Sequence, residues 1–124
     1  MRTGKPLSVF LRVAFIGCII SLAILAWMPA KAMTRTMLGG HTEHFIAYLG
    51  TAVLMGLAYR KRPRLVAQCI LLIMYAVILE VGQVYAPDRH PSLEDLAFSS
   101  TGVMVGALSL WMARDRMLSW LRLD

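Results

Sequence analysis

The chain has 124 residues, of which 58% are hydrophobic and only 16% are charged. A soluble domain typically carries about 25% charged residues, so the excess of apolar side chains is expected to face lipid. At about 20 residues per crossing, the length allows four spans and excludes a separate soluble domain. The net charge of +6 comes from basic residues between apolar runs, which argues against nucleic acid as a partner. We predict one all-α integral membrane domain over residues 1–124.

The first apolar run covers Val13–Trp27 and ends before Pro29, which predicts a span over about 9–28. An alternative interpretation is a cleavable signal peptide, because Arg2 and Lys5 precede the run and the small residues of Ala30–Ala32 follow it. The run is long for a signal peptide and the rest of the chain stays apolar. We therefore favour a retained span.

Two further runs follow, and both carry polar residues at one end. The run Phe45–Tyr59 is preceded by histidines and a glutamate, and it predicts a span over about 43–59. A short basic loop leads to the third run, which predicts a span over about 65–85 and places Glu80 and Gln83 near its end. Because a buried carboxylate is expensive in a bilayer, Glu80 is a candidate functional residue.

The last run predicts a span over about 94–113. Ser92–Asp95 immediately before it is typical of a capping box at a helix start. Gly102 and Gly106 form a GxxxG motif, which allows close backbone approach within the bundle or, alternatively, between two copies in a homo-oligomer. After the run, arginines alternate with apolar residues up to Leu121, which predicts a short amphipathic C-terminal helix at the membrane surface.

The distribution of basic residues predicts the orientation in the membrane. Of the 13 lysines and arginines, ten lie near the two termini or in the middle loop, and the other three are Lys31, Arg35 and Arg89. Cytoplasmic segments carry the excess of basic residues. We therefore predict a multi-pass protein of the inner (cytoplasmic) membrane, with both termini in the cytoplasm and its polar residues on the outer face.

The polar residues near the ends of the spans form one candidate ligand site. Glu80 and Gln83 share a helix face, and His44 lies one turn from Tyr48. Hydrogen bonds between the histidines and the carboxylates across neighbouring helices are the structural alternative. A metal site is a weaker alternative, because the spacing is not HExxH and no cysteine is near; we predict no metal, no cofactor and no catalytic residue. The predicted ligand-binding residues are His41, Glu43, His44, Tyr48, Glu80, Gln83, Arg89 and Asp95.

The same residues resemble the motifs of the VanZ-like membrane proteins. His44 followed by Tyr48 resembles their first motif, and the second is matched by Glu80, Gln83, Pro87, Arg89, Pro91, Ser92, Asp95, Gly102 and Gly106. The resemblance spans roughly residues 41–106 and implies a four-helix membrane protein. The chain departs from the family pattern at Gly40, Leu79 and Ser99, and these departures lower the charge of the site.

The resemblance implies a role in susceptibility to the glycopeptide teicoplanin. We expect the polar site to bind a component of the cell envelope, either a membrane lipid headgroup or a lipid-linked precursor. Two alternatives are a small-molecule transporter of the four-helix type and a membrane enzyme that acts on a lipid-linked substrate. The sequence contains no recognised catalytic constellation, which disfavours the enzyme.

Overall fold

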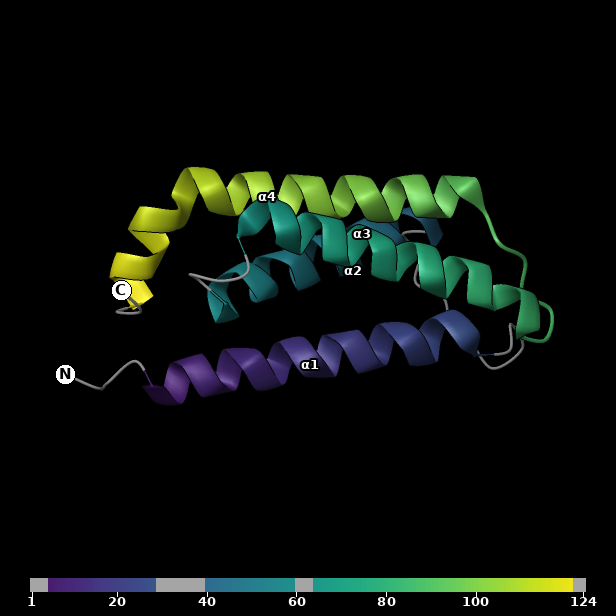
Figure 1. Ribbon diagram of the computed structural model, residues 1–124, viewed down its shortest axis with the longest axis horizontal. Coiled ribbons are helices and arrows are strands. Elements are labelled where there is room, and N and C mark those ends of the chain that lie inside the picture. The colour runs from purple at the N-terminus through teal and green to yellow at the C-terminus, as the bar shows by residue number, and fades with distance from the viewer. Residues whose placement is uncertain (1–4, 29–39, 60–63, 122–124) are drawn as a thin grey trace.

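The structure is a computed structural model that describes residues 5–28, 40–59 and 64–121, and these residues fold into helices without a strand. The long helices pack into an up-and-down bundle (Figure 1). They are α1 (Lys5–Trp27), α2 (Gly40–Ala58), α3 (Leu65–Gly82) with the short 3₁₀ helix η2 (Gln83–Tyr85), and α4 (Leu93–Leu121). The all-helical prediction is confirmed.

The two ends of the bundle differ in composition. α1 begins and α4 ends at one end (Figure 1), which we call the terminal end. At the other end, α1 and α3 finish while α2 and α4 begin. We call this the polar end, because the acidic residues of the first turns of α2 and α4 lie here. The sequence therefore brings its separated polar segments to one end of the fold.

Helix α2 occupies the middle of the bundle and contacts each of the other three long helices. Seven of its residues are buried, compared with two in α1. The main core cluster contains Tyr48, Ala52 and Met55 of α2, with Phe15, Leu72, Ala76 and Val103 from the other helices. Within the described part of the chain, the backbones of α1 and α4 do not come close to each other, so α1 joins the bundle through α2 and α3.

The two glycines of the GxxxG motif pack α4 against α2 within the chain. A Cβ atom on Gly102 would collide with the carbonyl oxygen of Phe45, and one on Gly106 would lie 2.6 Å from the carbonyl oxygen of Leu49. Only glycine permits so close an approach of two helix backbones. The prediction that the motif serves packing within the bundle is confirmed.

Three helical segments are long and apolar enough to cross a membrane: Lys5–Trp27, Leu65–Tyr85 and Leu93–Ala113. Large apolar side chains along all three, such as Phe10, Ile78 and Trp111, are exposed on the outside of the bundle, as expected for a multi-pass membrane protein. Among the described residues, α2 is not in this set, because its first turn is polar and glycine and threonine residues interrupt it. The fourth crossing therefore stays a prediction.

The helix predicted at the C-terminus is continuous with α4. α4 runs without a break from Leu93 to Leu121, and its last turns bend away from the helix axis (Figure 1). The physical reason is that neither proline nor glycine follows Gly106, so nothing in the sequence ends the helix at Ala113.

Side chains from α1 bond to carbonyl groups at the C-termini of two other helices. The last four carbonyl groups of a helix have no partner within it. Arg12 Nε donates to the carbonyl oxygen of Ala58 at the end of α2 (3.3 Å), and its guanidinium lies over the Tyr59 ring. Trp27 Nε1 donates to the carbonyl oxygen of Leu79 near the end of α3 (3.1 Å). These bonds tie the ends of the helices to their neighbours.

Candidate functional site: a histidine–carboxylate cluster at the polar end

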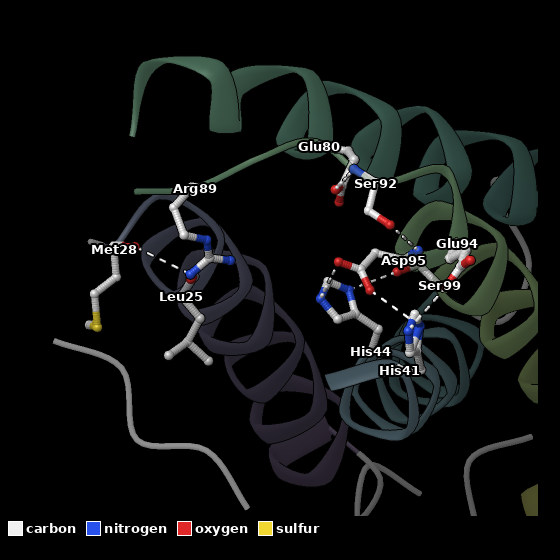
Figure 2. Close-up of polar contacts among 10 residues, drawn as sticks. All are labelled: Leu25, Met28, His41, His44, Glu80, Arg89, Ser92, Glu94, Asp95 and Ser99. Atoms are coloured by element: carbon white, nitrogen blue, oxygen red, sulfur yellow. Dashed lines mark hydrogen bonds and ion pairs between the residues drawn. The ribbon is translucent and has the colours of Figure 1, made fainter. Parts of the chain in front are cut away.

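Two histidines from α2 meet two carboxylates from α4. His41 Nδ1 lies 3.5 Å from Asp95 Oδ1, and His41 Nε2 lies 3.3 Å from Glu94 Oε2. His44 Nε2 lies 3.8 Å from the other oxygen of Asp95. Asp95 therefore bridges the two imidazoles (Figure 2). We call His41, His44, Glu94 and Asp95 the histidine–carboxylate cluster. Its histidines and carboxylates lie at ion-pair distances, but the hydrogen bonds predicted between them stay a prediction, because His41 Nδ1 has no hydrogen-bond partner among the described residues.

The helices that carry the cluster fix its geometry. His41 and His44 are three residues apart in the first turns of α2, so both face α4. His44 Nδ1 lies 3.1 Å from Ser99 Oγ, which is one turn beyond Asp95 and buried. The ring of His41 also packs on Phe98, with centroids 4.8 Å apart. The imidazoles are thus held by polar and aromatic contacts from one face of α4.

The capping box predicted at Ser92–Asp95 is half wrong. Ser92 Oγ accepts the backbone N–H of Asp95 (3.2 Å), as expected for an N-cap. The backbone N–H of Ser92, however, donates to Glu80 Oε1 (2.7 Å) and not to Asp95. Because the end of α3 lies beside the start of α4, Glu80 takes the place that the third helical residue has in a capping box. The carboxylate of Asp95 is directed to the histidines instead.

Arg89 lies apart from the histidines, beside the end of α1 (Figure 2). Its Nη1 donates to the carbonyl oxygens of Leu25 (3.3 Å) and Met28 (3.2 Å). A tight turn presents it there: the N–H of Arg89 bonds to the carbonyl oxygen of Ala86, and Asp88 has a φ of 57°, as in a type II turn. These bonds make Arg89 a cap of α1. The structure therefore does not place its guanidinium in the histidine–carboxylate cluster.

The remaining predicted residues lie at different depths. Glu43 is half-buried in the first turn of α2. Tyr48 belongs to the core cluster, and Gln83 is buried in η2. Glu80 is buried one turn beyond Ala76 of that core cluster. The structure thus brings His41, His44 and Asp95 together, connects Glu80 to them through the start of α4, and leaves Arg89 outside.

The sequence interpretation missed Ser99 and Glu94 as members of the site. Ser99 follows Asp95 by four residues, so the helical period places both on one face of α4. That spacing was the available signal for Ser99. Glu94 was assigned only to the capping box, and nothing in the sequence indicates that His41 lies opposite it.

The cluster does not have the geometry of a metal centre or of a serine hydrolase. Among the residues the structure describes, no group of three or more His, Cys, Asp and Glu is placed to hold a metal ion. Ser99, His44 and Asp95 follow one another as in a catalytic triad. However, the His44–Asp95 distance of 3.8 Å is too long for a hydrogen bond, and Ser99 is 2% exposed, so a substrate cannot reach its hydroxyl. The arrangement suits recognition of a polar group.

Comparisons with known proteins do not assign the chain to a family. No family model, no curated protein and no solved structure matches it. The resemblance to the VanZ-like proteins therefore stays a prediction.

Proposed function

We propose that the chain is a VanZ-like protein of the inner membrane that binds a component of the cell envelope at its polar end. The bound component is a membrane lipid headgroup or a lipid-linked precursor, and binding alters susceptibility to teicoplanin. One observation carries the proposal: polar side chains from three helices converge at one end of the bundle.

The energetics support a binding role. A carboxylate at membrane depth costs several kcal/mol, and Glu80 is buried at the end of a candidate span. A single hydrogen bond from Ser92 uses one of its two oxygens, and a carboxylate accepts several. A set of imidazoles and carboxylates at headgroup depth offers both donors and acceptors to a polar headgroup.

Native mass spectrometry of the gently purified protein tests the proposal. We expect a defined lipid adduct in the wild type that is lost in Asp95→Asn, because the bridge between the two histidines is removed. The matched control is Asp88→Asn: Asp88 is an exposed carboxylate at the same end, outside the cluster, and asparagine tolerates its φ of 57°. Bare protein in the wild type, or the same adduct in both variants, contradicts the proposal.

The resistance part of the proposal has its own test. A teicoplanin-susceptible host that expresses the wild-type protein should survive higher teicoplanin concentrations than the same host with Asp95→Asn. Expression of Asp88→Asn at the same level is the control. Equal susceptibility with and without the wild-type protein contradicts this part and leaves the binding part standing.

The proposed orientation is tested by labelling single cysteines from outside the cell. Glu94 at the polar end and Trp120 near the end of α4 are similarly exposed, at 79% for the Glu94 side chain and 84% for Trp120. In a background with Cys18 and Cys69 replaced by alanine, a membrane-impermeant maleimide should label Glu94→Cys in intact cells. It should label Trp120→Cys only after lysis, and the reverse pattern contradicts the orientation.

A further inference from the structure

The half of α1 nearest the polar end contains no fully buried residue. The only buried residues of α1, Leu11 and Phe15, lie in its other half. From Ile16 to Trp27 every side chain is exposed or only half-buried. A Cβ atom added to Gly17 would meet nothing within 4 Å. This half-helix is therefore held by half-buried side chains such as Ile19 and Leu22, with Trp27 packed on Gly82 at its end, and not by fully buried ones.

Hydrogen bonds from side chains hold this half of α1 to α3 and the following loop. The Tyr75 hydroxyl donates to the carbonyl oxygen of Ile19, and the Trp27 indole N–H donates to that of Leu79. Arg89 donates to the carbonyl oxygens near the end of α1. Between membrane helices such bonds contribute only about 0.6 kcal/mol each on average.

The contact between α3 and residues 16–27 of α1, which we call the seam, leads to the candidate site. Trp27 contacts the turn of α3 that carries Glu80. Its indole N–H bonds to the carbonyl oxygen of Leu79, and a Cβ atom added to Gly82 would lie only 2.5 Å from Trp27 Nε1. Glu80 in turn bonds to Ser92 at the start of α4. When α1 moves away, this turn of α3 faces the hydrocarbon of the bilayer.

We propose that the seam between α3 and residues 16–27 of α1 opens sideways, and that a lipid enters the polar site through it from the bilayer. This inference rests on the proposed function and narrows its ligand to a molecule with an acyl or polyprenyl anchor. The anchor stays in the bilayer while the headgroup reaches Glu80 and the histidine–carboxylate cluster.

Spin-label distances in lipid nanodiscs test the opening. One label pair spans the seam near the polar end, at Ile24 of α1 and Val81 of α3. The control pair, Val9 and Val66, spans the same two helices near the terminal end; all four side chains are more than half exposed. With Cys18 and Cys69 replaced, we expect a second, longer distance for the pair near the polar end and a single distance for the control pair.

Two conservative variants keep the test decisive. Tyr75→Phe and Trp27→Phe each remove one hydrogen bond and keep a ring in place. Each should raise the fraction of the longer distance about threefold to twentyfold, which corresponds to about 0.6–1.7 kcal/mol for a hydrogen bond in a membrane protein. The control pair should not change.

The outcome is separable from that of the binding experiment. A single narrow distance at both pairs, unchanged by both variants, overturns the sideways opening even if the adduct is found. An adduct without an acyl or polyprenyl chain overturns the inference that the ligand carries a lipid anchor. Opening without any adduct supports the seam and contradicts the proposed binding function.

Discussion

Replacement of Gly106 by alanine places a methyl group between α2 and α4 where their backbones are in close contact. The new Cβ atom would lie 2.6 Å from the carbonyl oxygen of Leu49 and 3.2 Å from Cβ of Ala52. Real Cβ contacts essentially never fall below 3.0 Å, so α4 has to move away from α2 by at least 0.4 Å. The obstructing oxygen belongs to the backbone of α2 and cannot rotate aside.

The magnitude follows from a comparison with a second glycine. Gly50 is also helical, and a Cβ atom there would meet nothing within 4 Å. Gly50→Ala should therefore stabilise the protein by about 0.5–1 kcal/mol, through helix propensity alone. Gly106→Ala gains the same amount but suffers overpacking of about 1–3 kcal/mol. The difference between the two variants isolates the overpacking, so Gly106→Ala should be less stable than Gly50→Ala by about 1–3 kcal/mol.

Reversible unfolding by sodium dodecyl sulfate in mixed micelles, followed by far-ultraviolet circular dichroism, measures this difference. Both variants differ from the wild type by one methyl group, so their unfolded states are closely matched. Equal stability of the two variants would refute the close approach of α2 and α4 at Gly106.

Three other substitutions test individual contacts. Ser92→Ala removes the cap of the Asp95 N–H and should cost about 1 kcal/mol in the same titration; an unchanged midpoint would show that the cap does not contribute. Arg89→Ala should speed amide hydrogen exchange in the last turn of α1, because two carbonyl groups lose their donor, and unchanged exchange would exclude that capping role. Trp27→Phe should cost about 0.5–1.5 kcal/mol through loss of its hydrogen bond to α3; wild-type stability would argue against this bond.

The helices were largely predictable because local signals define them. The apolar run over 65–85 matches α3 and η2, since Pro63 precedes it and Pro87 follows it. The tail after Ala113 was predicted to be helical, and it continues α4 because a change in composition at Arg114 does not stop a helix. The position of α2 at the centre of the bundle could not be predicted, since it depends on which faces of the other three helices meet.

The site was predictable in part, for a related reason. His41, His44 and Asp95 were singled out correctly as neighbours, because helices that start at the same end bring their first turns together. The roles of Glu80 and Arg89 depend on which helix end lies beside each of them. A single sequence does not contain that information. The bond from the Ser92 N–H was therefore assigned to Asp95 although Glu80 accepts it, and Arg89 was predicted to bind the ligand although it caps α1.

The exchange of caps between helices has a consequence for biogenesis. Arg12 reaches a carbonyl group 46 residues later in the chain, and Arg89 reaches carbonyl groups 64 and 61 residues earlier. The carbonyl groups of Leu25 and Met28 at the end of the first helix therefore gain this donor only after the loop before the last helix has been made. A nascent chain that stops before Arg89 lacks both of these bonds, whereas one that extends past Ser92 contains the residue that makes them.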